Sequence, residues 1–218
     1  MSRYALQWRI LPGNSESYDV AHVVSTVDAK LSGKTLFVLG SSITFGYGSG
    51  GQALGEYLKQ RFHIKLIKDA VNGTTLAGDD GDTYVARLKR HTAYTDHPDI
   101  FLVQLSTNDV WRNIPLDTVR ESIETIVSYI KEQWNVPIFF YTNTYFAHGQ
   151  YAQTVEMVNE LQRQRKDFYV LDLFHDEQLN SISSRQHKLY MLDDIHPTRA
   201  GYTQWWGPAV EKKLLALL

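Results

Sequence analysis

Ser42 is the residue in this sequence whose position best suits a nucleophile. It lies two residues after Gly40, which ends an apolar run, and a glycine-rich stretch follows it. A turn from a buried strand into a helix exposes a hydroxyl at the edge of a sheet and points the positive end of the helix toward it. A serine hydroxyl at its ordinary pKa is a poor nucleophile, so the hypothesis requires a base, a group that orients the base, and an oxyanion hole.

An Asp-x-x-His motif late in the chain supplies a candidate base, His196, and a candidate orienting group, Asp193. An aspartate three residues upstream on a tight loop can reach the second imidazole nitrogen, and Pro197 favours an extended backbone at His196. The spacing is weak evidence by itself, because the chain contains 8 histidines and 24 acidic residues. Two other histidines, His148 and His175, are interpreted as solvated loop residues without an acidic partner at this spacing.

Two further loops offer donors for an oxyanion. Asn108 follows the apolar run at 100–106, and its carboxamide is a candidate donor. Gly73 follows the run at 64–70, and a glycine lets its backbone N–H approach a substrate oxygen closely. Each residue also has an ordinary structural interpretation, a helix cap for Asn108 and a plain turn for Gly73, and for each residue taken alone both interpretations stay open.

Apolar runs that alternate with helical periodicity predict the elements that position these residues. The runs cover residues 35–40, 64–70, 100–106, 137–143 and 168–173. Helical segments are expected around residues 54–62, 116–130, 155–161 and 198–218, the last broken at Gly207-Pro208 because proline cannot donate to the helix ladder. This alternation predicts an α/β fold, a three-layer α/β/α sandwich around a five-stranded parallel sheet. The chemistry of such a fold lies in the loops after the carboxyl ends of the strands.

Composition limits the class of protein further. The 218 residues carry a formal net charge of -2, which gives no indication of nucleic-acid binding or of attraction to an anionic membrane. The absence of cysteine excludes disulfides, thiolate metal sites and a cysteine nucleophile. The first residues contain no continuous apolar stretch, so we expect no signal peptide, no membrane insertion and a cytoplasmic location. The length favours a single domain over residues 1–218.

The stretch Gly46–Gly51 leaves a nucleotide-binding enzyme as an alternative. It matches G-x-G-x-x-G, and Asp69 follows at about the distance of the acidic residue in that fingerprint. The first glycine of the fingerprint should end the strand, however, whereas here Gly40 ends the apolar run and Gly46 comes six residues later. The spacing therefore disfavours a dinucleotide site.

Taken together, four segments resemble the sequence blocks of the SGNH hydrolase superfamily, the GDSL-like esterases, lipases and acylhydrolases. They are Gly40-Ser41-Ser42-Ile43, Asn72-Gly73, Ser106-Thr107-Asn108-Asp109 and Asp193-Asp194-Ile195-His196. The resemblance covers about residues 34–207 and departs from the family pattern twice, with Ser41 in place of an Asp and Ser106 in place of a Gly. Residues 1–33 lie outside it, as an N-terminal extension that packs on the domain or contacts another subunit.

The resemblance implies a flavodoxin-like fold and serine-dependent hydrolysis of carboxylic esters through an acyl-enzyme on Ser42, without a metal or an organic cofactor. His196 would be the base and Asp193 its orienting group. The backbone N–H groups of Ser42 and Gly73 and the side chain of Asn108 would form the oxyanion hole.

The substrate implied by the resemblance is a small acyl or acetyl ester, with no nucleic-acid partner. A carbohydrate O-deacetylase or an acyltransferase would use the same residues, and a non-catalytic binding module is a further alternative. Candidates for the substrate pocket are four aromatic residues near the loops, for which ordinary packing is an equally good interpretation: Tyr47, Trp111, Tyr145 and Phe146. Whether the chain forms a homo-oligomer stays open.

Overall fold

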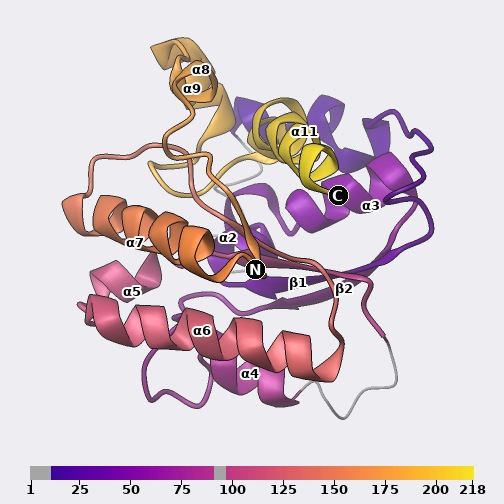
Figure 1. The fold of residues 1–218 in the computed structure, drawn as a ribbon. Coiled ribbons are helices and arrows are strands. Elements are labelled where there is room, and N and C mark those ends of the chain that lie inside the picture. The colour runs from indigo at the N-terminus through magenta and orange to yellow at the C-terminus, as the bar shows by residue number, and fades with distance from the viewer. Residues whose placement is uncertain (1–10, 91–96) are drawn as a thin grey trace.

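The computed structural model describes residues 11–90 and 97–218, so the predicted N-terminal extension lies partly outside the described residues. A parallel sheet runs through the middle of the protein, with helices on both faces (Figure 1). Its five strands are β1 (Thr35–Gly40), β2 (Lys65–Ala70), β3 (Ile100–Gln104), β4 (Ile138–Tyr141) and β5 (Tyr169–Leu171). The strand order is β2-β1-β3-β4-β5, which confirms the predicted five-stranded parallel α/β fold.

Side chains of the central strands alternate between two hydrophobic cores, as the two-residue period of a strand requires. Phe37 of β1 and Phe101 of β3 lie in one core, where their rings stack with centroids 4.9 Å apart. Leu36 and Leu102, their neighbours in the chain, lie in the core on the opposite face. Burial on both faces explains why these strands have continuous apolar sequences.

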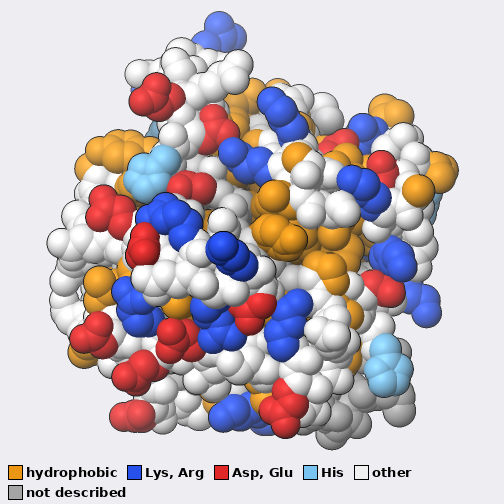
Figure 2. All heavy atoms as spheres, in the orientation of Figure 1, with side chains coloured by type: hydrophobic (Ala, Val, Ile, Leu, Met, Phe, Trp, Pro, Cys, Tyr) orange, Lys and Arg blue, Asp and Glu red, His pale blue; other side chains and the backbone are white. Residues whose placement is uncertain are grey.

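Helices of matching periodicity cover each face. The first core is covered by α4 (Tyr84–Arg90), α6 (Leu116–Gln133) and α7 (Gly149–Arg165). The second is covered mainly by α3 (Leu54–Phe62) and α11 (Gly207–Leu217). Short helices complete the chain: α2 (Ser42–Phe45), α5 (Asn108–Trp111), α8 (Glu177–Asn180), α9 (Ser184–Tyr190) and α10 (Arg199–Gly201). The outer face of α6 and α7 presents interspersed basic and acidic side chains (Figure 2), in agreement with the small net charge.

The expected break of the last helix at Gly207-Pro208 was wrong. The backbone stays helical, but residues Tyr202–Trp206 form a π-helix between α10 and α11. The N–H of Gly207 donates to the carbonyl of Tyr202, five residues back, and Pro208 falls in the first turn of α11. Proline is tolerated there because the N–H groups of a first turn need no partner within the helix.

The part of the N-terminal extension that the structure describes packs on the sheet domain. It contains three 3₁₀ turns, η2 (Pro12–Asn14), η3 (Glu16–Tyr18) and η4 (Val20–His22). Thr26 continues the contact by donating its N–H to the carbonyl of Arg61 in α3. No helix within residues 11–90 and 97–218 is both long and apolar enough to span a membrane.

Candidate active site

The candidate nucleophile lies at the carboxyl end of β1, in the interior of the sheet. Gly40 ends the strand, Ser41 has a backbone that is neither helical nor extended (φ -115°, ψ -139°), and Ser42 opens the short helix α2. A side chain at Gly40 would overlap Thr44 Oγ1, since a Cβ there would lie 1.8 Å from it. The tight turn therefore requires glycine. Ser42 follows it at the carboxyl-terminal end of the strands and is 9% exposed.

Ser42 and His196 lie 154 residues apart in the sequence and meet at this edge. Ser42 Oγ is 2.8 Å from His196 Nε2. On the other side of the ring, His196 Nδ1 is 2.9 Å from Asp193 Oδ2 and 3.1 Å from Asp193 Oδ1. With the Nδ1–H donating to the carboxylate, Nε2 is free to accept a proton from the serine hydroxyl. The structure thus brings together the three residues that the sequence singled out.

A hairpin presents His196 and Asp193 at its tip. Met191 and Pro197 form an antiparallel bridge, and Leu192 donates its N–H to the carbonyl of His196. The Asp193 carboxylate also accepts the backbone N–H groups of Ile195 and His196, at 2.8 and 2.7 Å. Burial opposes ionisation of Asp193, but the hydrogen bonds from His196 and from these N–H groups hold its pKa below the usual value. Asp193 therefore stays an anion beside the imidazole.

His175 corrects one expectation from the sequence. It was interpreted as solvated and without an acidic partner at the Asp-x-x-His spacing, but Asp172 stands three residues before it. His175 Nδ1 is 2.8 Å from Asp172 Oδ2, the same pairing as in the other motif. Within the described residues, however, His196 also contacts a serine hydroxyl and His175 does not. The Asp-x-x-His spacing thus defines a paired histidine, and only the fold makes it a candidate base.

The predicted oxyanion donors lie in the loops after β2 and β3, the two strands that flank β1 and its candidate nucleophile. Gly73 follows β2 and has a φ of 76°, a left-handed conformation that favours glycine. Asn108 follows β3 as the first residue of α5, and its Nδ2 donates to the carbonyl of Thr74 at 2.8 Å. That bond uses one of the two amide N–H groups, and the second is left to donate to a substrate oxygen. Among the described groups, none accepts a hydrogen bond from the N–H of Ser42 or Gly73.

The side chain of Gln104 accepts the hydrogen bonds donated by the residues next to the nucleophile. One of these residues is Ser41, which stands where the family pattern has an aspartate. Its Oε1 accepts the N–H of Ser41 at 2.9 Å and the hydroxyl of Thr44 at 2.9 Å. The N–H of Thr44 lies 3.3 Å from the same oxygen. A neutral amide on β3 therefore fixes the turn that presents Ser42. The other departure, Ser106, accepts the N–H of Asn108 through its hydroxyl at 3.1 Å.

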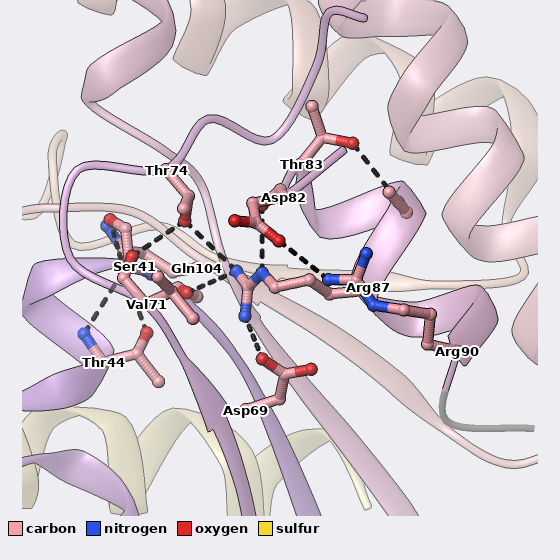
Figure 3. A network of polar contacts seen from close by, with 12 residues as sticks. Ser41, Thr44, Asp69, Val71, Thr74, Asp82, Thr83, Arg87, Arg90 and Gln104 are labelled. Atoms are coloured by element: carbon pink, nitrogen blue, oxygen red, sulfur yellow. Dashed lines mark hydrogen bonds and ion pairs between the residues drawn. The ribbon is translucent and has the colours of Figure 1, made fainter. Parts of the chain in front are cut away.

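Arg87 of α4 ties the loops after β1 and β2 together (Figure 3). Its guanidinium donates to the carbonyl of Gly40 at 2.7 Å and to the hydroxyl of Thr74 at 3.3 Å. It also pairs with Asp69 at the end of β2 and donates to the carbonyl of Asp82. The side chain is only 3% exposed, so this network fixes the backbone around the nucleophile from inside the fold.

Asp109 joins the loop after β2 to the loop after β3. Its two carboxylate oxygens accept the N–H groups of Leu76 and Ala77, both at 2.9 Å. Asp109 is 1% exposed, and this burial raises the pKa of its carboxyl group against the opposing effect of the hydrogen bonds. Sequence reasoning did not assign roles to Gln104, Arg87 or Asp109, because the sequence gives no signal of which distant backbone groups a buried polar side chain will meet.

The four aromatic pocket candidates separate into an exposed and a buried group. Tyr47 is 40% exposed and lies against His196, with ring centroids 5.1 Å apart. Trp111 and Tyr145 are 59% and 63% exposed, and Trp111 packs edge-on against His148. Phe146 belongs to the hydrophobic core, 8% exposed, so the exposed aromatic candidates are Tyr47, Trp111 and Tyr145. No group of three or more His, Asp or Glu side chains suited to a metal ion occurs in the described parts of the chain.

Comparison with known proteins agrees with this geometry. A sequence model of the GDSL-like lipase/acylhydrolase family matches residues 38–204, most of the chain. No curated protein is similar enough in sequence to match. Among solved structures, TesA superposes with a TM-score of 0.65 at 18% identity, covering 85% of this chain and 100% of TesA.

Two further solved structures share the fold. Axe2, an acetylxylan esterase from Geobacillus stearothermophilus, has a TM-score of 0.60 at 18% identity and covers 84% of this chain and 94% of its own. The psychrotrophic esterase EstA from Pseudoalteromonas sp. has a TM-score of 0.60 at 16% identity and covers 84% of this chain and 99% of its own. The chain belongs to the GDSL-like lipase/acylhydrolase family of the SGNH hydrolases, and it is an ester-hydrolysing enzyme.

Proposed function

We propose that this enzyme hydrolyses carboxylic esters through an acyl-enzyme on Ser42. The observation that carries the proposal is the continuous chain of contacts from Ser42 Oγ to His196 Nε2, 2.8 Å, and from His196 Nδ1 to Asp193 Oδ2, 2.9 Å. In this mechanism Ser42 attacks the acyl carbonyl while its proton passes to His196. The imidazolium that forms is stabilised by the Asp193 carboxylate.

The oxyanion of the tetrahedral intermediate accepts hydrogen bonds from the N–H groups of Ser42 and Gly73 and from the Asn108 amide. His196 then gives its proton to the leaving alcohol as the ester C–O bond breaks, which leaves the acyl group on Ser42. Water attacks this acyl-enzyme, with His196 again accepting a proton, and the acid is released as Ser42 regains its hydrogen.

A second candidate within the same chemistry is deacetylation of a carbohydrate ester. It is supported by the exposed aromatic rings of Tyr47 and Trp111 near the site, since a flat exposed ring provides an apolar face for a sugar, and by the fold shared with the acetylxylan esterase Axe2. Hydrolysis of acetyl esters but not of butyryl or longer esters would favour the deacetylase. Transfer of the acyl group to an added alcohol would favour an acyltransferase.

The test of the proposed nucleophile is Ser42→Ala, assayed on a small activated ester. Loss of the nucleophile or the base of a serine triad lowers kcat by about 10⁶, so Ser42→Ala and His196→Ala should both lose all measurable turnover. A matched control is Ser15→Ala, which removes an exposed hydroxyl that contacts the hydroxyl of Ser17 away from the candidate nucleophile. Near-normal turnover by Ser42→Ala would refute the proposal.

A further inference from the structure

The segment before the family match packs directly against the hairpin that carries His196. The match begins at residue 38, whereas the contact is made by η2. A methyl group added at Gly13 would lie 1.8 Å from the carbonyl oxygen of Leu189 and 2.5 Å from Thr198 Oγ1. Leu189 and Thr198 close the base of the hairpin, where Thr198 Oγ1 donates to the Leu189 carbonyl at 2.7 Å. The N-terminal segment therefore packs so closely on the base of the hairpin that no side chain larger than that of glycine fits at position 13.

Asn14 joins this hairpin to the glycine-rich loop after the nucleophile. Its side chain is buried, with the residue 4% exposed. Asn14 Nδ2 donates to the carbonyl of Gly48 at 2.8 Å, and Asn14 Oδ1 accepts the N–H of Arg199 at 2.8 Å. Gly48 belongs to η5 (Tyr47–Ser49), and Arg199 stands three residues after His196. One carboxamide thus links the glycine-rich loop to the backbone three residues after His196.

The loop that Asn14 holds, η5, packs against His196. A methyl group at Gly48 would lie 2.5 Å from the carbonyl oxygen of Pro197 and 3.2 Å from His196 Cβ. The ring of Tyr47, one residue earlier, lies 5.1 Å from the imidazole centroid. A displacement of η5 would therefore move or release the ring that must face Ser42.

A second set of contacts anchors the segment at Asp19. The Asp19 carboxylate accepts a hydrogen bond from Gln52 and pairs with Arg199 Nη1 at 3.3 Å. The Gln52 side chain in turn accepts the N–H of Val20 at 3.0 Å. The segment is therefore attached both to the chain after the glycine-rich loop and to the chain after His196.

We infer that Asn14 is a positioning residue for His196, although it lies outside the part of the chain that defines the family. It acts through the backbone of Gly48 and Arg199 and does not contact the reacting atoms. The inference rests on the proposed function, in which His196 is the base. A misplacement of about 1 Å in a catalytic group lowers a rate by about 10²-fold, so loss of this bridge should be visible in turnover.

The experiment compares Asn14→Ala and Asn14→Asp with Ser15→Ala, an exposed neighbour whose hydroxyl, within residues 11–90 and 97–218, contacts only the exposed Ser17 hydroxyl. Asn14→Asp keeps the acceptor for Arg199 and loses the donor to Gly48. Turnover of a small ester is normalised to the sites that an alkyl fluorophosphonate titrates, so that unfolded molecules are not counted. The second-order rate of that labelling is measured as well, because it reports activation of the serine.

For both Asn14 variants we expect kcat per titrated site and the labelling rate to fall together by about 10- to 100-fold, with KM nearly unchanged. Ser15→Ala should match the wild type. Wild-type kcat and labelling in both Asn14 variants, alongside an inactive Ser42→Ala, would overturn the inference and leave the proposed function intact. Failure of both variants to fold would also overturn it, because Asn14 would then serve the fold alone. An active Ser42→Ala would remove the proposed function and the inference with it.

Discussion

Asp193→Asn tests the orienting carboxylate, because the structure shows which way an amide would turn. Asp193 Oδ1 accepts two backbone N–H groups, from Ile195 at 2.8 Å and His196 at 2.7 Å. In the variant, the amide oxygen takes that place and the NH₂ group faces His196 Nδ1. Nδ1 must then be the unprotonated nitrogen, so the proton sits on Nε2 and the ring cannot accept one from Ser42.

The size of the loss follows from the alternative orientation of the amide. Turning it over would restore the active tautomer but would leave two backbone N–H groups facing an NH₂, at a cost of about 1–3 kcal/mol each. A total of about 2–6 kcal/mol leaves only one molecule in about 30 to about 10⁴ in the active arrangement. We therefore expect kcat on p-nitrophenyl acetate to fall by a factor of about 30 to about 10⁴, with the fold preserved as judged by circular dichroism.

The chain offers two matched controls for this experiment. Asp172→Asn makes the same change in the second Asp-x-x-His motif, which ends at His175. In the described parts of the chain, Ser42 pairs with His196 and not with His175. Asp194→Asn changes the immediate neighbour of Asp193, whose side chain is 84% exposed. Both should retain kcat within about threefold of the wild type. An Asp193→Asn variant within tenfold of the wild type, or an equal loss in Asp172→Asn, would refute the reasoning.

Three further outcomes are expected. Asn108→Ala should lower kcat by about 10²–10³ through loss of one oxyanion donor, as steady-state kinetics will show; an unchanged kcat would remove Asn108 from the oxyanion hole. Gln104→Leu should cost about 2 kcal/mol or more in urea denaturation and also lower kcat, because it leaves the buried backbone N–H groups of Ser41 and Thr44 without an acceptor; wild-type stability would contradict the role of Gln104. Because burial raises the pKa of Asp109 in the folded state, the folded chain holds that proton to higher pH than the unfolded chain does. The stabilisation that Asp109 contributes should therefore be lost as pH rises from about 4 through the folded pKa, so urea midpoints of the wild type should fall more, or rise less, across that window than those of Asp109→Asn; parallel pH profiles would contradict it.

The sequence was sufficient to predict the sheet and the order of the site segments. The strands β1 and β3 are buried on both faces, so their sequences are continuous apolar runs, and the turn residue Gly40 marks the end of β1. The edge strand β2 contains Lys65, Lys68 and Asp69, and it was still predicted, as part of the apolar run at 64–70. Parallel topology then placed the segments after these strands at one edge.

The residues that fix the site were less predictable, because their partners are backbone groups brought close only by folding. Gln104 and Arg87 serve carbonyls and N–H groups of other loops, and neither belongs to a motif. Asn14 lies 182 residues before His196 in the chain and outside the family resemblance. Asp172 and His175 show that a motif alone can also mislead. They have the expected spacing and form the expected pair, but they do so away from the candidate nucleophile.

The central claim is that Ser42 is the activated hydroxyl, and covalent labelling tests it most directly. The wild-type protein is treated with an alkyl fluorophosphonate, and the modified residue is identified by mass spectrometry of the digested protein. The mechanism predicts one adduct per chain, on the peptide that contains Ser42, and a strongly reduced labelling rate in His196→Ala. An adduct on another residue, or ester hydrolysis that persists when Ser42 is fully modified, would contradict the mechanism.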